Sequence, residues 1–444
     1  MKKKIIGTLF FILLIAATVL PASAMINELI SDVVPASFNS LDGGWIEERD
    51  GVKILHVNGT YYEMGYQHGY ILRDEIPINL RIMKDFFNNS KFSYDDVIEK
   101  WNVMKNYVPE QYLSEMQGVV DGSGLSLEEI GVLNIVHDVV NLIYCCGGIA
   151  WGSATVDGEL VHLRSGDMSI FFKDAKTGTY LQDHQVLIVR DPEFGYASMS
   201  PVMAGDIGSY GGFNEKGICV SENTCVTDDT TLHGISASFR MRMVLDNAVN
   251  EEEALYIMDS NRTCGWNLFI SDGNIPKGYV LEQTANVSYI STWNDSIESI
   301  YPFWMIENVS RRSNCFISPD CAVMERKHYN PSGFRSLLRL ILGLDNYFVP
   351  WTHYKALSKG FENNWGNLDL NTTMDMFRNV YLGKTNLLFY IMMKLYFYQP
   401  VHQWVACPKN GDMVISFASA DKMAQYNPVH YFNLFELLEA KPPP

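Results

Sequence analysis

The chain has 444 residues, of which 47% are hydrophobic and 19% charged, and its net charge is −17. This composition supplies enough apolar side chains for a large folded core and excludes an intrinsically disordered protein. The acidic balance argues against nucleic acid and against anionic lipid surfaces as partners.

The first 24 residues have the features of a cleaved secretory signal peptide. Three lysines precede an apolar run, Ile5–Leu20, and small residues follow at Ala22–Ala24. The alternative is a membrane anchor, for which the run is short. No later stretch reads as membrane-spanning, and the best candidate, residues 387–398, is short and contains a lysine. We therefore expect a secreted or extracytoplasmic protein whose mature chain begins near residue 25.

Residues 25–144 read as a mainly helical N-terminal segment. Between about Tyr61 and Leu142, apolar residues recur at helical spacing. Ser93 and Ser126 each precede acidic residues, which is typical of helix N-caps. We expect the last of these helices to end just before Tyr144.

Residues 145–444 show short apolar runs separated by turns, which predict a strand-rich part. Asp157-Gly158 is typical of a hairpin turn, whereas 236–258 and 332–344 read as helices. Strands followed by helices and again by strands favour a layered α+β fold over regularly alternating βαβ units. Because no repeat or flexible linker interrupts this part, we expect one continuous fold.

Eight cysteines are sparse for a chain of this length. Export would permit disulfides, with Cys219–Cys225 and Cys315–Cys321 as the short-loop candidates. The sequence contains no Cys-x-x-Cys pair, and its ten histidines are scattered. We therefore expect neither a metal site nor another cofactor.

Two adjacent cysteines, Cys145 and Cys146, stand at the expected start of a strand and are followed by two glycines. If the bond before Cys145 were cut, this residue would gain a free α-amine with an ordinary pKa of about 7.7–8.0. Such an amine accepts the thiol proton, so a single residue supplies nucleophile and base. The alternative is that the two cysteines are buried small residues or half of a disulfide.

Side chains alternate along a strand, so Cys146 is expected to face away from Cys145 and to be a buried small residue. Gly147 and Gly148 carry no side-chain bulk, and we expect them to let a substrate approach the strand.

A nucleophilic thiol needs a cation, a carboxylate that holds the amine, and donors for the oxyanion. Arg164 stands at the end of the returning strand and Asp167 in the turn that follows, and we expect this spacing to bring both side chains to the first residue of the cysteine strand. Asn223, at a later strand end, suits an oxyanion hole. The alternatives are a surface ion pair for the first two and a turn residue for Asn223. The histidines are expected to be structural, because this mechanism needs none.

The stretch CCGGIAWGSATVDGELVHLRSGD resembles the nucleophile hairpin of the acyl-coenzyme A:6-aminopenicillanate acyltransferase family. These proteins are self-processing cysteine N-terminal-nucleophile hydrolases, related to acid ceramidase, bile-salt hydrolases and phospholipase B-like proteins. Weaker similarities follow the family's order along most of the chain: GTYYEMGYQHGYIL, GGFNEKGICVSENT, SNCFISPD, SGFRSLLRL and VHQWVACPKNGDMVISFAS.

The resemblance implies a four-layer αββα N-terminal-nucleophile hydrolase sandwich with an N-terminal helical segment. Residues 145–444 would be the catalytic part, and the segment before the cut would stay associated with it. The implied catalytic residues are Cys145, Arg164, Asp167 and Asn223, and the implied substrate-binding residues are Trp151 and Arg335. Cys146 stands where the family has Ser or Thr, so Cys146 stays an alternative to Cys145 as the nucleophile.

The expected function is hydrolysis or acyl transfer at a carbon–nitrogen amide bond of a small acylated substrate. Two alternatives stay open: a phospholipase B-like hydrolase of acyl esters, and a binding protein that kept the fold without the chemistry. A processed N-terminal cysteine would separate the enzymes from the binding protein. A panel of amide and ester substrates would separate the two enzymes.

Overall fold

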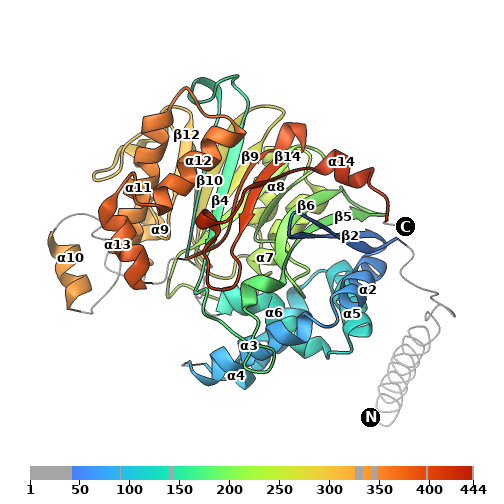
Figure 1. Ribbon diagram of the computed structural model, residues 1–444. Coiled ribbons are helices and arrows are strands. Elements are labelled where there is room, and N and C mark those ends of the chain that lie inside the picture. Colours follow the sequence, from blue (N-terminus) through green and yellow to red (C-terminus); the bar gives the residue numbers. More distant parts are fainter. Residues whose placement is uncertain are drawn as a thin grey trace, which may run out of the picture. The chain divides into compact units, whose positions relative to one another are not determined.

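Two β-sheets packed face to face form the centre of the structure, and helices cover the outer face of each sheet (Figure 1). The expected four-layer αββα arrangement of the α+β class is therefore confirmed. The structure is a computed structural model in which the described residues are 43–90, 92–139, 144–325, 334–342, 348–396 and 399–442. The signal peptide expected in residues 1–24 lies outside them.

The first sheet has nine strands in the order β1-β2-β5-β6-β7-β8-β9-β10-β11. Its neighbouring strands run antiparallel except β2 and β5, which are parallel. The strands are β1 (Trp45–Arg49), β2 (Val52–Gly59), β5 (Gln185–Pro192), β6 (Ser198–Met203), β7 (Gly211–Asn214), β8 (Ile218–Thr224), β9 (Trp266–Asp272), β10 (Lys277–Gln283) and β11 (Ser288–Ser291).

The second sheet has six antiparallel strands in the order β12-β3-β4-β13-β14-β15. The strands are β3 (Tyr144–Ala150), β4 (Val161–Asp167), β12 (Val309–Arg312), β13 (Pro400–Cys407), β14 (Asp412–Phe417) and β15 (His430–Asn433). The expected hairpin after Tyr144 is the β3–β4 pair.

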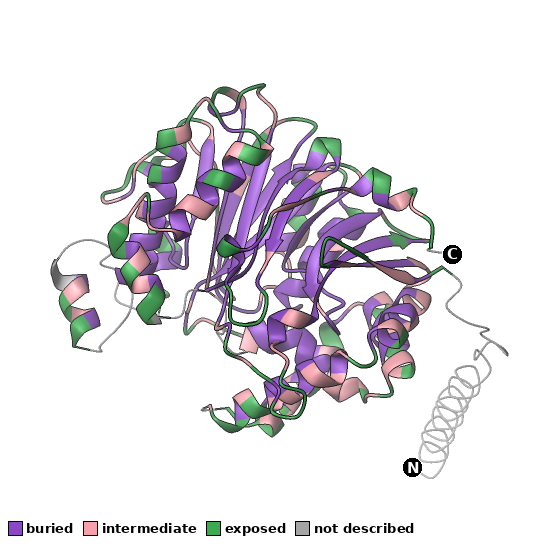
Figure 2. Ribbon diagram, in the orientation of Figure 1, coloured by how far each residue is buried: buried purple, intermediate pink, exposed green. Residues whose placement is uncertain are grey.

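Alternating side chains build two separate cores on the nine-stranded sheet. Ile54 and Leu187 point to the six-stranded sheet, where they meet side chains such as Trp404. Their neighbours Leu55 and Ile188 point outward, into a core shared with the N-terminal helices. Figure 2 shows the consequence: the strands are buried along most of their length, whereas exposed residues lie on outer helix turns and loops.

Helices of the N-terminal segment form where the sequence predicts them. They are α2 (Tyr61–Ile71), α3 (Ile76–Asn88), α4 (Tyr94–Met104), α5 (Glu110–Ser123) and α6 (Leu127–Val139). Both expected N-caps are present, since Ser93 accepts a hydrogen bond from the Asp96 amide and Ser126 from the Glu129 amide. The sequence did not reveal that residues 45–59 before these helices form β1 and β2. β2 pairs with β5, so this segment also supplies two strands of the nine-stranded sheet.

Further helices complete the outer layers. α7 (Ala237–Asn247) and α8 (Glu251–Asp259) pack on β8 and β9, whereas α11 (Phe348–Asn364), α12 (Leu370–Tyr381) and α13 (Leu387–Tyr396) pack on the six-stranded sheet. The remaining helices are α9 (Pro319–Ala322), α10 (Phe334–Ile341) and α14 (Leu434–Leu438). Within the described ranges, every helix is too short or too polar to cross a membrane.

The two short-loop disulfides that export would permit are not formed, because Cys219 and Cys321 keep free thiols. Cys219 lies on β8 and Cys225 just beyond its end. Six residues of extended chain span about 20 Å, well beyond the roughly 7 Å limit between the Cα atoms of a disulfide. Cys315 and Cys321 belong to different core clusters.

Four glycines let α2 and α5 cross with their backbones in contact. Gly65 and Gly69 lie on α2, and Gly118 and Gly122 lie on α5. A Cβ atom at any of them would collide with backbone atoms of the other helix. The glycine spacing of the GTYYEMGYQHGYIL stretch therefore has a packing role.

We expect Gly118→Ala to lower the free energy of unfolding by about 1–3 kcal/mol, the usual cost of overpacking a tight contact. Urea unfolding of the purified protein measures the change. Gln117→Ala on the exposed face of the same helix is the control and should change it by less than about 0.5 kcal/mol. Equal stabilities of the two variants would contradict this account of the helix contact.

Candidate active site

Cys145 is the second residue of β3, which is an interior strand of the six-stranded sheet. β12 and β4 pair with β3 on its two sides. The Cys145 side chain points toward β8 of the other sheet, and its thiol is fully buried. The strand thus begins at the expected place, but it is not a sheet edge.

The Cys145 thiol lies beside a guanidinium and a carboxylate. Nη2 of Arg164 is 3.6 Å from Sγ, and Oε1 of Glu222 is 3.9 Å from it. Arg164 and Glu222 form a buried ion pair with an N–O distance of 2.5 Å. Because β4 supplies the arginine and β8 the glutamate, this pair joins the two sheets next to the thiol.

Further contacts hold the Arg164 side chain in place. Nη1 lies 2.6 Å from Nε2 of His402, and Nε donates to the backbone oxygen of Glu222 at 3.3 Å. Burial and the charge of Arg164 lower the pKa of His402 well below its usual value, so a neutral imidazole accepts this hydrogen bond. Burial alone would lower the pKa of Arg164, but Glu222 and Cys145 outweigh it and raise the pKa. The guanidinium is therefore a fixed positive charge at the thiol.

The intact chain keeps the Cys145 thiol protonated at neutral pH. Burial and the neighbouring Glu222 raise its pKa well above the usual range, against the opposite effect of Arg164. Burial also raises the pKa of Glu222, although Arg164 opposes this shift. Oε2 of Glu222 has no hydrogen-bond partner among the described residues. A carboxylate with a raised affinity for a proton thus lies beside the thiol.

Asn314 binds the peptide nitrogen of Cys145. Its Oδ1 accepts a hydrogen bond from this N–H at 3.0 Å, and its Nδ2 donates to the backbone oxygen of Thr224 at 2.8 Å. Asn314 lies just beyond β12, so the end of the strand beside β3 delivers it. The side chain therefore touches one of the two atoms of the peptide bond between Tyr144 and Cys145.

Asn223 lies on β8 beside Glu222 and is fully buried. Its Nδ2 donates to the backbone oxygen of Arg312 at 3.0 Å, and its Oδ1 has no partner in the described part of the chain. One N–H of the amide is engaged, and the second is available for another acceptor.

Asp167 does not reach the same point as Arg164, which corrects the expectation from their spacing. Asp167 is the last residue of β4 rather than a turn residue, and positions three apart on a strand face opposite sides. Its carboxylate accepts hydrogen bonds from Ser165 at 2.5 Å and Tyr381 at 2.6 Å. Burial raises its pKa to about 7. Its charge raises the pKa of the Cys145 thiol, whereas its backbone N–H, which donates a hydrogen bond to this thiol, lowers it.

Cys146 faces the helices on the other side of β3, as the alternation of side chains predicts. Its Sγ lies 3.3 Å from the Tyr381 hydroxyl, in the core under α11 and α12. Burial raises the pKa of this thiol as well. Arg164, the cation that contacts the Cys145 thiol, points to the opposite face of β3.

Gly147 and Gly148 do not open β3 to a substrate. A Cβ atom at Gly147 would lie 2.8 Å from the ring of Phe269, and one at Gly148 would lie 2.8 Å from the ring of Phe361. The two glycines instead allow an aromatic ring to pack against each face of the strand.

Of the two residues expected to bind substrate, Trp151 is not brought to the thiol. Trp151 packs with Phe269 and Val280 between the sheets. It is six residues from Cys145 along an extended strand, which corresponds to about 20 Å. Arg335 lies on α10, but its side chain is outside the described part of the structure.

A cavity of about 460 Å³ lies where α6 and β8 end, and Cys145, Arg164 and Glu222 are not among the residues that line it. Its lining includes Asp138 and Val139 at the end of α6, Cys225 just after β8, and Cys264. Cys225 follows Thr224, the residue that holds Asn314. Among the described residues, no group of three or more His, Cys, Asp and Glu side chains could hold a metal ion.

Sequence reasoning missed three residues that contact the site. Glu222, Asn314 and His402 lie 77, 169 and 257 residues from Cys145, and no local motif marks their roles. Glu222 and Asn314 do lie within GGFNEKGICVSENT and SNCFISPD, two of the stretches that resemble the family, but the resemblance assigns neither residue a role.

Asp167→Asn should change how stability depends on pH. The pKa of Asp167 is about 7 in the folded protein and about 3.9 in the unfolded chain. Its contribution to stability is therefore complete below pH 4, where the carboxyl group is protonated in both states, and is lost as the pH rises through 7. The variant does not titrate there. We therefore expect the free energy of unfolding of the variant, relative to that of wild type, to rise by about 1.4 kcal/mol per pH unit between pH 4 and pH 7. Urea unfolding at pH 5 and pH 8 measures it, and equal differences at both values would contradict the assignment.

Comparison with known proteins supports the resemblance in the sequence. The chain is 23% identical over 268 residues to protein dcd1B from Dictyostelium discoideum, covering 54% of this chain and 52% of that protein. It is 25% identical over 277 residues to an uncharacterized protein from Archaeoglobus fulgidus, covering 53% and 44%. The chain thus spans about half the length of the curated relatives it matches.

Two solved structures are also similar. One is a Caenorhabditis elegans ortholog of N-acylethanolamine-hydrolyzing acid amidase, with 13% identity, a TM-score of 0.39, and coverage of 65% of this chain and 99% of that one. The other is penicillin V acylase from Agrobacterium tumefaciens, with 14% identity, a TM-score of 0.39, and coverage of 66% and 87%. Residues 173–314, which follow the β3–β4 hairpin, match the model of the acyl-coenzyme A:6-aminopenicillanic acid acyltransferase family, and the chain therefore resembles that family, as its sequence predicts.

Proposed function

We propose that the chain is an exported enzyme that cuts itself between Tyr144 and Cys145 and then uses Cys145 as an N-terminal nucleophile. Its reaction is the hydrolysis of a small acylated amide, or the transfer of the acyl group to another acceptor. One observation carries the proposal. The Cys145 thiol touches Arg164 and Glu222, while Asn314 holds the peptide nitrogen of the same residue.

Self-cleavage begins when the Cys145 thiol gives its proton to Glu222 and the thiolate attacks the carbonyl carbon of Tyr144. The bond from this carbon to the Cys145 nitrogen breaks, and the nitrogen takes the proton from Glu222. The product is a thioester between Tyr144 and the Cys145 side chain, next to a free α-amine. Water hydrolyses the thioester, restores the thiol and leaves Tyr144 as a carboxyl terminus.

In the cut enzyme the α-amine of Cys145 takes over as proton acceptor, since its ordinary pKa is about 7.7–8.0. Arg164 stabilises the thiolate, which attacks the acyl carbon of the substrate. The second N–H of Asn223 donates to the negative oxygen that forms. The leaving amine takes the proton from the α-ammonium group, and water or an acceptor then removes the acyl group from the thioester.

The 460 Å³ cavity is the proposed substrate pocket. Its volume lies within the range of about 300–1,000 Å³ that is usual for small-molecule sites. Val139, the last described residue before Tyr144, and Cys225 both line it. The pocket therefore lies where α6 and β8 end, and β8 carries Glu222 and Asn223 a few residues before Cys225.

An amide substrate is favoured over an ester because residues 173–314 match an acyltransferase family named for an amine acceptor, 6-aminopenicillanic acid. The same thiol chemistry also cleaves esters, so a phospholipase B-like activity is the second outcome of a substrate test.

The two fragments are expected to stay together after the cut. β2 remains paired in parallel with β5 across the cut. Arg242 of α7 forms a buried ion pair with Glu115 of α5 at 3.2 Å, and the Tyr112 hydroxyl donates to Asp246 at 2.9 Å. Breaking these contacts would leave buried charges without partners, which is costly.

Cys145→Ala should leave one uncut and inactive chain, because it removes the attacking thiol. Cys146→Ser should still cut and turn over, because Cys146 faces the opposite side of β3. Intact-mass measurement and sequencing of the new N-terminus check both. If the new N-terminal residue is Cys146, the nucleophile is Cys146 rather than Cys145. Activity in a chain that has not been cut would contradict the mechanism. In wild type, both fragments should elute together from a sizing column.

Asn223→Ala should lower kcat by about 10²–10³-fold, the cost of one lost oxyanion donor. The measurement uses matched amides and esters of the same acyl group. Asn274→Ala, in the turn after β9, is the matched control and should leave kcat unchanged. Unaltered turnover in the Asn223 variant would assign this residue a purely structural role, and turnover of esters alone would overturn the amide assignment.

A further inference from the structure

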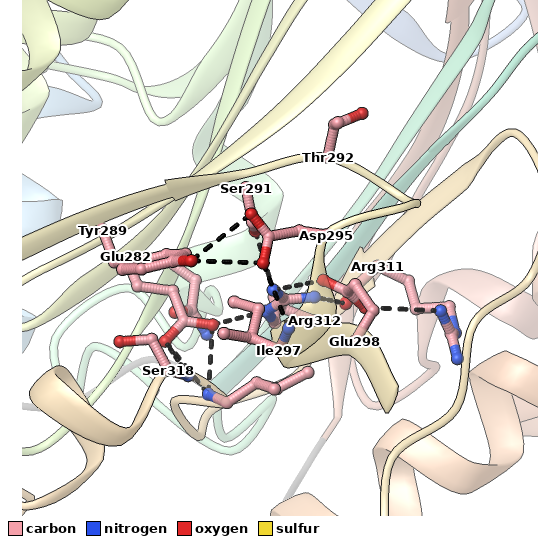
Figure 3. A network of polar contacts seen from close by, with 12 residues as sticks. Glu282, Tyr289, Ser291, Thr292, Asp295, Ile297, Glu298, Arg311, Arg312 and Ser318 are labelled. Carbon is pink, nitrogen blue, oxygen red and sulfur yellow. Dashed lines mark hydrogen bonds and ion pairs between the residues drawn. The ribbon is translucent and has the colours of Figure 1, made fainter. Parts of the chain in front are cut away.

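A network of four buried charges lies on the other side of β3 from Arg164 (Figure 3). Glu282 on β10 accepts a hydrogen bond from Nε of Arg312 on β12 at 2.7 Å. Glu298 pairs with Nη2 of Arg312 at 2.6 Å and with Nη1 of Arg311 at 3.8 Å. All four side chains are buried, and with two charges of each sign the network is neutral as a whole.

The Glu282 carboxylate holds both ends of one short segment of the chain. Besides Arg312, it accepts hydrogen bonds from the backbone N–H groups of Ile317 at 3.0 Å and Ser318 at 2.8 Å. In Figure 3, Arg312 and Ser318 both approach this carboxylate, although they are six residues apart. The Glu282 side chain, from the nine-stranded sheet, therefore holds the two ends of residues 312–318 close together.

This segment positions two side-chain amides, and one of them contacts Cys145 directly. Asn314, in its middle, accepts the hydrogen bond from the Cys145 nitrogen. The backbone oxygen of Arg312 accepts the hydrogen bond from Asn223. Arg312 is also paired across the sheet with Gly147 of β3. A shift of residues 312–314 would thus displace both amides relative to Cys145.

We propose that Glu282 and Arg312 are positioning residues, whose ion pair sets the places of Asn314 and Asn223 relative to Cys145. This role rests on the self-cleavage and thiol chemistry proposed above. Stability alone does not require the network, because well-packed apolar side chains often replace a buried ion pair without loss of stability. Charged hydrogen bonds are directional, and they fix the segment more narrowly than apolar packing does.

The test compares wild type with Glu282→Gln and with the double variant Glu282→Gln/Arg312→Met. The single variant leaves Arg312 with one carboxylate fewer, so it should unfold at a lower temperature. The double variant removes one charge of each sign and leaves Arg311 with Glu298, so it should unfold within a few degrees of wild type. We still expect self-cleavage about 10–100-fold slower, the effect of a misplacement of about 1 Å. kcat should fall similarly, with KM within about twofold.

Glu115→Gln is the matched control, because it breaks the buried ion pair with Arg242 and contacts no group beside Cys145. At a temperature at which every variant is folded, it should cleave within about twofold of wild type despite its lower unfolding temperature. A double variant that cleaves and turns over as fast as wild type would overturn the positioning role.

A second measurement does not depend on cleavage. In a Cys145→Ala background, Glu282→Gln should speed hydrogen–deuterium exchange in peptides that contain residues 312–318 and the start of β3. Unchanged exchange in both peptides would overturn the role of Glu282. A wild-type chain that never cuts would instead overturn the proposed function, and the exchange result would still decide whether Glu282 holds the segment.

Discussion

Two buried arginine–glutamate pairs cross from one sheet to the other on the two sides of β3. Arg164 of β4 reaches Glu222, and Arg312 of β12 reaches Glu282. A buried charge that loses its partner costs several kcal/mol, so each pair ties its strand firmly to the facing sheet. β3 lies between the two tied strands. The depth and direction of its first side chains, including the Cys145 thiol, follow from this constraint.

The local part of the site could be anticipated from the sequence, because its signals lie close together in the chain. A cysteine at a strand start, a hairpin turn and a returning arginine predict that Arg164 comes back beside Cys145, and it does. Period-2 alternation likewise predicts that Cys146 faces the other way. The same rule, applied to Arg164 and Asp167, would have placed them on opposite faces; treating Asp167 as a turn residue led to the error. The helix caps at Ser93 and Ser126 could also be predicted, because the residues that form each cap are close together in the sequence.

The remaining parts depend on contacts between distant segments, which no short pattern encodes. Glu222 and Asn314 reach Cys145 only because β8 and β12 are packed against its strand. β1 and β2 were missed because their membership of the sheet depends on pairing with β5, more than 120 residues later. Gly147 and Gly148 were expected to leave space for a substrate, but the rings of Phe269 and Phe361, one on each face of β3, fill that space.

The position of β2 has a consequence for how such a protein is made. β2 precedes the proposed cut, yet it lies inside the nine-stranded sheet and covers one side of β5. A chain produced from residue 145 onward would present β5 as a bare edge, whose unpaired backbone groups recruit other strands. If the proposed cut occurs, β1, β2 and the helices that follow them therefore remain part of the fold rather than being discarded. The two fragments of the proposed cut would then have to be synthesised as one chain.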